Sequence, residues 1–259
     1  MLSPSARAVG IAGVAIVTSV AAASALDAAR VSDAQKAVNE LAARAKDSHQ
    51  TGAPPRLSDP QVAALFDRVF DTKAVETARV PFSEVQRLMD WFSAANQIGT
   101  IYILAGTNLT DTSKAGDDPQ ALQRIESNIS TFAPEMGRYY DFMVTMSGVI
   151  SDTFGPWLAS LKKEQRERPN VKSGADQVRS GLVGVVSGAL SSLVNEDVDD
   201  AFRRDRMVKL NAVAPKLAAF LEAEQLTALQ GAAAEVAGAV SDPGVQASVK
   251  AFGDKLKKP

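Results

Sequence analysis

Apolar residues recur at helical spacing along almost the whole chain, and this periodicity constrains the fold more than any other feature. One clear case places five apolar side chains on a single helix face at i, i+3, i+4, i+7 and i+8: Val62, Leu65, Phe66, Val69 and Phe70. Alanine, the strongest helix former, occurs 43 times among the 259 residues. The sequence therefore predicts an all-α fold, a bundle of about seven to nine helices with mostly antiparallel neighbours.

Several helix starts are marked by capping residues. An aspartate followed by proline occurs at 59–60, 118–119 and 242–243, and this pair is typical of an N-cap followed by the first helical residue. Ser83 with Gln86 three positions later has the pattern of a capping box. Four helices are therefore expected to begin at these positions.

Three stretches are nearly free of charge and are expected to be buried. They span residues 91–110, 142–161, where Asp152 is the only charged residue, and 180–195. The second stretch contains Gly155 and Pro156, which predict a helix break. In the third, Gly181, Gly184 and Gly188 remove side chains from one side of a helix, which favours a close helix crossing in a soluble core over one in a membrane.

The N-terminus has the three parts of a secretory leader in order. Arg7 is followed by the apolar run 8–20 and then by the small-residue triplet 23–25, which predicts cleavage before Leu26. The rival interpretation is an uncleaved anchor, because residues 8–26 form 19 uncharged positions. A third interpretation makes this segment the apolar start of a buried helix. The leader or anchor would place the rest of the chain in the periplasm, outside the cell, or on the periplasmic face of a membrane.

The expected domain organisation follows from these segments. Residues 1–25 form an apolar leader helix, either a signal peptide or an anchor, residues 26–57 an N-terminal helix and linker, and residues 58–259 the all-α domain. Linkers are also expected at 107–118 and 168–173. Such short connections suit neighbouring antiparallel helices in one bundle.

The composition excludes several classes of function. The chain has no cysteine and one histidine, His49, in an expected loop, so thiol chemistry, cysteine-bound metals and most histidine-dependent hydrolases are ruled out. Lys and Arg number 28 against 30 Asp and Glu, which gives no basic footprint for nucleic acid. The acidic run 196–200 is interpreted as a helix start whose acids pair with Arg203 and Arg204. No metal and no cofactor are expected.

Six bulky side chains in the middle of the chain are the candidate residues for binding a ligand or a protein partner. Several of them follow helical spacing and would line an apolar groove, although the same spacing also suits the core of a helix held between two layers. The candidates are Trp91, Tyr102, Tyr139, Tyr140, Met143 and Trp157.

One short segment resembles a known group of proteins. Residues 226–230 read Leu-Thr-Ala-Leu-Gln, which is similar to the Leu-Thr-x-x-Gln segments of small periplasmic helical chaperones of the CpxP and Spy type. The likeness extends over about a dozen residues of a chain that is larger and less charged than those chaperones, and we do not assign the chain to them. It implies a chaperone-like role as one alternative.

The leading functional hypothesis is a non-catalytic, exported bundle of a bacterial envelope that binds a protein partner or an apolar ligand. It combines the leader with the shortage of catalytic groups. The alternatives are a protein that is anchored through residues 8–26 or inserts its uncharged stretches into a membrane, a periplasmic chaperone, and a helical enzyme without His or Cys chemistry. The sequence leaves the oligomeric state open.

Overall fold

The computed structural model describes residues 28–76, 78–110, 118–195 and 198–257, and these are helical almost throughout, with no strand among them. The all-α prediction is confirmed. Nine of the described helices have seven or more residues: α2 (Ala28–Arg44), α4 (Pro60–Val69), α6 (Val85–Ile103), α7 (Pro119–Thr131), α8 (Ala133–Ser160), α10 (Pro169–Ser191), α11 (Asp200–Phe220), α12 (Ala223–Ala239) and α13 (Pro243–Lys255). The short elements are α3 (Ser48–Thr51), α5 (Thr72–Glu76), α9 (Lys163–Arg166) and the 3-10 turns η1 (Phe82–Glu84) and η3 (Ser192–Val194).

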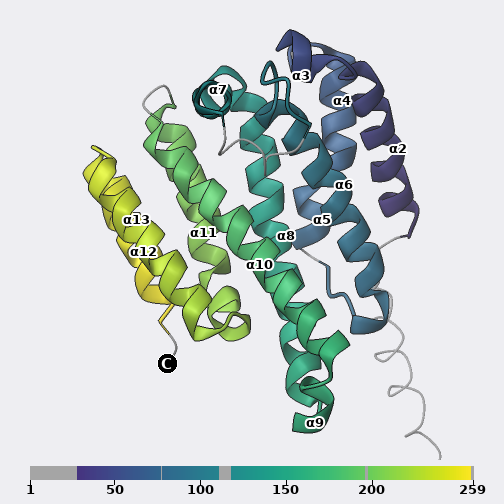
Figure 1. Cartoon of the computed structure of the whole chain (residues 1–259), viewed down its shortest axis with the longest axis vertical. Coiled ribbons are helices and arrows are strands. Elements are labelled where there is room, and N and C mark those ends of the chain that lie inside the picture. The colour runs from purple at the N-terminus through teal and green to yellow at the C-terminus, as the bar shows by residue number, and fades with distance from the viewer. Residues whose placement is uncertain (1–27, 77, 111–117, 196–197, 258–259) are drawn as a thin grey trace, which may run out of the picture.

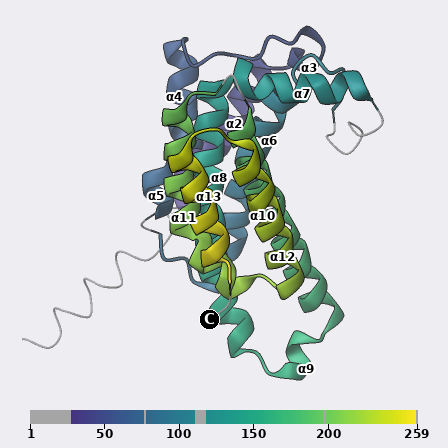
Figure 2. The ribbon, with the colours of Figure 1, turned by 90° about the vertical axis from the view of Figure 1, so that its left-hand side faces the viewer.

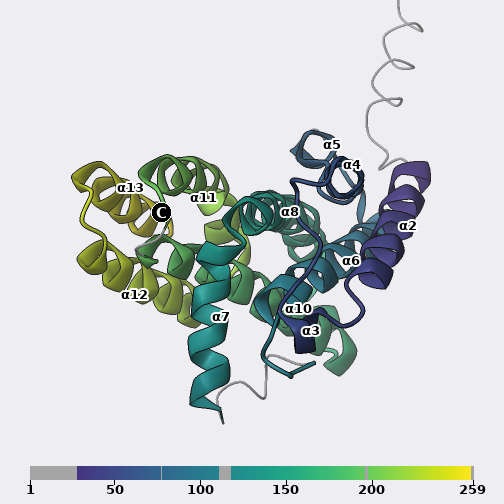
Figure 3. The ribbon, with the colours of Figure 1, turned by 90° about the horizontal axis from the view of Figure 1, so that it is seen from above.

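Helix α8 runs through the middle of the bundle (Figure 1). It contacts α5 and α6 on one side and α10 and α11 on the other, while α2 and α4 cover the first side and α12 and α13 the second. From α8 to α13 the long helices alternate in direction. Helix α7 lies across one end of the bundle and α9 closes the opposite end (Figure 2), and the view from above shows α7 lengthwise among helices seen nearly end-on (Figure 3).

The three Asp-Pro helix starts are confirmed. Asp59, Asp118 and Asp242 each cap a helix with proline in its first turn. Each carboxylate accepts a backbone N–H of the first turn, at 2.8 Å for Asp59, 2.9 Å for Asp118 and 2.7 Å for Asp242. These bonds satisfy donors that have no partner inside the helix, so the local sequence alone determines where these helices begin.

Two expectations about helix ends are wrong. Ser83 caps no helix, because it lies inside η1, and α6 begins at Val85. Helix α8 does not break at Gly155 and Pro156 but continues to Ser160. Pro156 is exposed, whereas its neighbours Phe154 and Leu158 are buried, and their packing outweighs the loss of one backbone hydrogen bond.

The structure describes only part of the acidic run 196–200, since residues 196 and 197 lie outside the described residues. Asp199 caps α11 by accepting the Phe202 N–H at 2.7 Å. Arg203 pairs with Asp200 at 2.7 Å, three residues back rather than four, and Arg204 lies 3.7 Å from Asp242. The run is therefore a helix start with local ion pairing, as expected, but with different pairs.

The uncharged part of α8 forms the centre of the core. Phe142, Met143, Val144, Met146 and Ile150 have no exposed surface. Because α8 is covered on both sides, even polar residues of this helix are buried, and Ser147 and Ser151 donate their hydroxyl groups to carbonyls four residues back. The expectation of a helix held between two layers is confirmed for this segment.

The glycines of α10 do not all lie at a close helix crossing. A Cβ added at Gly181 or Gly184 would meet open space, and only Gly188 approaches another helix, through Tyr140. The tight approach lies at Gly99 instead, where an added Cβ would collide with the Tyr139 ring. Helix α10 packs against α8, α11 and α12 with other faces, so Gly181 and Gly184 remain exposed, and the predicted crossing is wrong for these two residues.

The N-terminal helix and the segment that follows it pack onto the same core as the later helices. Helix α2 buries Ala34, Val38 and Leu41 against α4 and α6. The segment before α4 is tied to α6 and α8, because the Tyr102 hydroxyl donates to the Pro55 carbonyl at 2.6 Å and the Leu57 N–H donates to a buried carboxylate of α8 at 2.7 Å. The expected leader lies outside the described residues.

Candidate ligand-binding groove

A groove of about 580 Å³ opens at the α9 end of the bundle. The residues that line it lie at 155–159 in α8, 163–179 in α9 and α10, and 219–222 at the end of α11. We call this feature the α9 groove. Its volume lies within the range of about 300–1,000 Å³ that is typical of small-molecule sites.

Local sequence signals build the wall formed by α9. The chain leaves α8 at Leu161, and the Lys162 N–H donates to the side chain of Gln165 at 2.9 Å, which closes the short turn of α9. Pro169 then occupies the first turn of α10. Helices α8 and α10 thus become antiparallel neighbours with a charged four-residue turn between them. The expected linker at 168–173 is wrong, because Pro169 opens the helix there.

The floor of the α9 groove is apolar. Leu158, Ala175 and Phe220 are buried and come from three different helices, and Val171 is half-buried beside them. Burial of an apolar ligand against such a floor is favourable by about 25 cal/mol per Å² removed from water.

One end of the α9 groove is closed by a satisfied arginine. The Arg179 guanidinium is stacked over the Phe220 ring, with its carbon 5.2 Å from the ring centroid, and donates to the Phe220 carbonyl at 3.1 Å. It also pairs with Asp176 at 3.3 Å and with Glu222 at 2.8 Å. Two carboxylates therefore oppose one guanidinium at this end.

The other end of the α9 groove carries unpaired positive charge. Lys163, Arg166 and Lys172 are exposed and line the groove. Within the described part of the chain none of the three has a carboxylate within 4.0 Å. Glu167 is the one acidic residue that lines this end, so its lining has an excess of two positive charges in a chain whose net charge is -2.

Two further hollows have a different character. One of about 600 Å³ lies between α2 and α6 and is lined mainly by polar side chains such as Gln35, Asn39 and Gln97. Another, of about 370 Å³, contains His49. The expectation of a loop at His49 is wrong, because His49 is half-buried within the short helix α3. This helix ends only at Gly52, which has a φ of 68°. Neither hollow combines an apolar floor with a cluster of unpaired cations.

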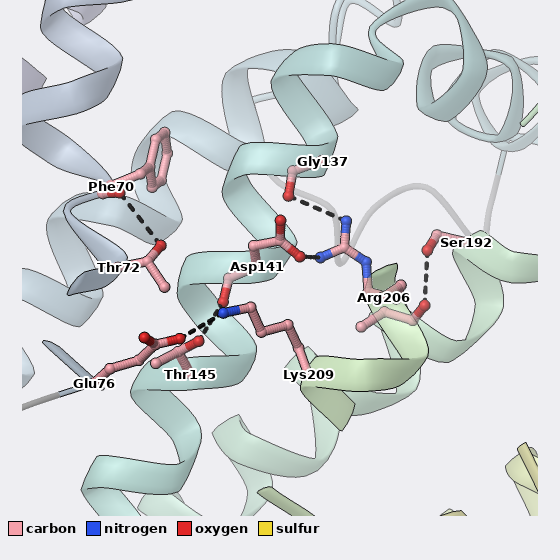
Figure 4. A network of polar contacts seen from close by, with 10 residues as sticks. Phe70, Thr72, Glu76, Gly137, Asp141, Thr145, Ser192, Arg206 and Lys209 are labelled. Atoms are coloured by element: carbon pink, nitrogen blue, oxygen red, sulfur yellow. Dashed lines mark hydrogen bonds and ion pairs between the residues drawn. The ribbon is translucent and has the colours of Figure 1, made fainter. Parts of the chain in front are cut away.

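A network of polar contacts lies away from the α9 groove, where α11 meets α8 (Figure 4). Arg206 is buried to 1% exposure and donates to the Asp141 carboxylate at 2.5 Å and to the Gly137 carbonyl at 3.1 Å. Its guanidinium lies 5.3 Å from the Tyr140 ring centroid and 4.8 Å from that of Phe202. Lys209 pairs with Glu76 at 2.5 Å one turn further along α11.

Burial shifts the ionisation of the groups in this region. Loss of hydration raises the pKa of the Asp141 carboxyl, although Arg206 opposes the shift, and lowers the pKa of Arg206. Burial also raises the pKa of Tyr140 to about 12 and that of Tyr139 still further. The groups whose pKa values are shifted here are packed inside the bundle, and burial is the main cause of each shift.

Five of the six candidate binding residues are buried in the core. Three of them donate hydrogen bonds to other residues of the same chain. Trp91 donates to the Val69 carbonyl at 2.7 Å, Tyr102 to the Pro55 carbonyl, and Tyr139 to the Asn96 side chain at 2.9 Å. Tyr140 lies under Arg206, and Met143 is fully buried.

Trp157, the sixth candidate, is half-buried and stacks on Phe82, with ring centroids 3.7 Å apart. None of the six lines the α9 groove. Their expected spacing is thus realised as core packing, and a role in binding remains a prediction.

Sequence reasoning missed the cations of the α9 groove. Residues 162–172 contain five Lys or Arg and two Glu, and this local excess of positive charge was the available signal. The apolar floor had no such signal, because Phe220 reaches Arg179 across 41 residues of sequence.

Membrane and metal features are limited in the described residues. One segment, Pro169–Val194, is long and apolar enough to cross a membrane, and 39% of its most apolar window is buried. A core helix of a soluble protein passes the same test. No group of three or more His, Cys, Asp or Glu that could hold a metal ion is found among the residues that the structure describes.

Comparison with known proteins finds no protein-family model, curated protein or solved structure that matches the chain. The function is therefore argued from its residues.

Proposed function

We propose that this chain is an exported, non-catalytic binding protein of a bacterial envelope and that the α9 groove holds its apolar ligand or protein partner. The observation that carries the proposal is the combination in one groove of a buried apolar floor with three unpaired cations. A ligand that covers this floor and meets these charges gains both hydrophobic and electrostatic free energy.

The export part of the proposal rests on the N-terminal sequence. A basic residue, an apolar run and a small-residue triplet follow one another within residues 7–25. Mass spectrometry of the protein isolated from cells that express the full chain is expected to find a mature form that starts at Leu26. A form that retains Met1 and sediments with membranes would contradict cleavage and support an anchor.

The absence of catalysis is proposed from the position of the shifted groups. Strongly perturbed pKa values often mark active sites, but here the large shifts belong to Tyr102, Tyr139 and Tyr140, which are buried in the core. The α9 groove is lined by the charged ends of Lys, Arg, Asp and Glu side chains beside apolar residues. Such a groove is equipped to hold a ligand.

A blocking substitution tests the α9 groove directly. Ala219→Phe places a ring in the groove, and Ala212→Phe is the matched control, exposed on the same helix seven residues earlier, or about 10 Å away. The full chain is purified under non-denaturing conditions, and native mass spectrometry compares bound small molecules and partners. Wild type and the control are expected to carry the same bound species, and Ala219→Phe to lose it. A wild-type protein without any bound species, or equal binding by all three, would contradict the proposal.

A second candidate function is membrane association through α10. Its apolar stretch is less covered than that of α8, and Gly181 and Gly184 present open faces. Flotation of the full chain with liposomes separates the two candidates. Protein that remains at the bottom of the gradient supports the first proposal, and protein that floats even after the leader is removed supports the second.

A further inference from the structure

We infer that the ligand of the α9 groove is a single-chain aliphatic carboxylate, the chemistry of a free fatty acid. This inference rests on the proposed function and specifies the ligand class. The cations at the α9 end call for an anionic head, and the apolar floor calls for a hydrocarbon tail.

The charge distribution defines the direction in which such a ligand lies. Lys163, Arg166 and Lys172 line the α9 end together with one acid, Glu167, whereas two carboxylates pair with Arg179 at the opposite end. A carboxylate is attracted to the first end and repelled by the second. The tail then lies over Val171 and Ala175 toward Phe220.

The walls of the α9 groove favour a hydrocarbon chain over an extended peptide. They consist of helix ends and first turns and, among the described residues, include no strand, so they present no strand edge to an extended chain. An extended peptide on this floor would find no backbone edge to pair with, and each buried peptide group left unpaired would be unfavourable. An aliphatic chain has no such groups to satisfy.

The dimensions favour one free chain over a lipid surface. From Val171 to Arg179 the groove follows α10 for eight residues, or about 12 Å. Its floor includes Leu158, at 9% exposure, and Phe220, at 3%, so little of either side chain is open to solvent, and the Arg179 guanidinium lies over the Phe220 ring. A planar membrane cannot reach such a floor, whereas a single chain can enter the groove.

Binding of dodecanoate, measured by titration calorimetry with the full chain, tests the inference. The uncharged analogue 1-dodecanol tests the need for the head group, and vesicles of phosphatidylglycerol test the alternative source of an anionic lipid. Dodecanoate is expected to bind about tenfold more tightly than the alcohol, and added salt is expected to weaken only the binding of the acid.

Variants locate the binding site. Lys163→Gln, Arg166→Gln and Lys172→Gln together are expected to weaken dodecanoate binding about tenfold and to leave dodecanol binding unchanged. The matched control removes three exposed cations elsewhere, through Lys36→Gln, Lys46→Gln and Lys250→Gln, and is expected to bind dodecanoate as the wild type does. Both variants change the net charge of the chain equally, so a difference between them reports position.

Several results would overturn the inference. These are equal affinity for the acid and the alcohol, equal loss in both triple variants, and binding to vesicles without binding to the free acid. If Ala219→Phe abolishes capture of a natural ligand while dodecanoate does not bind, the ligand class is wrong and the binding function of the α9 groove remains. If the wild type captures no natural ligand and does not bind dodecanoate, both the proposed function and the inferred ligand class fail.

Discussion

Positively charged side chains are buried and ion-paired in one part of the molecule and, within the described part of the chain, exposed without an ion-pair partner in another. At the contact between α8 and α11, the Arg206 guanidinium is withdrawn from water and bonded to Asp141 and Gly137. In the α9 groove, Lys163 and Lys172 are exposed without a carboxylate among the described residues within ion-pair distance. The buried charge must be compensated for the protein to fold, whereas the exposed charges are free to be compensated by a ligand.

This difference shows where binding chemistry is to be sought. At the contact between α8 and α11, the pKa values of Asp141 and Arg206 are shifted by burial, and the Arg206 guanidinium donates to the Asp141 carboxylate and the Gly137 carbonyl. The α9 groove keeps exposed cations without a carboxylate partner among the described residues beside an apolar floor. We therefore propose that the first region contributes to stability and that the second binds the ligand.

The largest effect is expected from Asp141→Asn. It leaves Arg206 buried without its carboxylate, and such a broken pair destabilises a protein by about 3–5 kcal/mol. The matched control is Asp152→Asn on the same helix. Asp152 pairs with Lys216 of α11 at 2.6 Å, but its side chain is 55% exposed, so the control should change stability by about 1 kcal/mol or less. Urea unfolding measures both, and equal losses would show that burial does not distinguish the two pairs.

The second prediction removes both members of the buried pair. Asp141→Leu with Arg206→Met replaces the ions with apolar side chains and leaves no charge to compensate. Because apolar replacement of a whole buried pair is often neutral, the double variant should be more stable than Asp141→Asn by about 2 kcal/mol. Urea unfolding of the double variant and of Asp141→Asn at the same pH measures the difference in their free energies of unfolding. A double variant less stable than the single one would mean that the pair contributes beyond charge compensation.

The third prediction compares a glycine that is packed against a buried ring, Gly99, with a glycine that faces open space, Gly184. Gly99→Ala forces a methyl group against the buried Tyr139 ring, whose hydroxyl is held by Asn96, and should destabilise by about 1–3 kcal/mol. Gly184→Ala adds a methyl group in open space on α10 and should stabilise by about 0.5–1 kcal/mol through helix propensity. Thermal unfolding reports both signs. A loss of stability at Gly184 would mean that its exposed face is covered by another molecule.

The smallest change in stability is expected from the triple glutamine variant of the α9 groove. Its three cations are exposed and unpaired among the described residues, so unfolding free energy should remain within about 0.5 kcal/mol of the wild type. The same variant should lose affinity for dodecanoate. A stability loss comparable to that of Asp141→Asn would contradict the separation of the two regions.

The sequence by itself determined the helical class and several helix starts. Asp59, Asp118 and Asp242 act within three residues of themselves, and the apolar period of each helix is a property of one segment. Local rules failed where packing overrides them. Pro156 stays inside a helix because the residues around it are buried, and Tyr139 and Met143 became core because α8 is covered from two sides.

The tertiary structure alone decided which charges are compensated and where the floor of the α9 groove lies. Asp141 and Arg206 are 65 residues apart, and Arg179 and Phe220 are 41 apart, so no local pattern records their contact. The excess of Lys and Arg near α9 is visible in the sequence, but it becomes a candidate binding site only when the ends of α8, α10 and α11 meet beneath it. The physical reason is that capping depends on neighbours along the chain, whereas burial and charge compensation depend on neighbours in space.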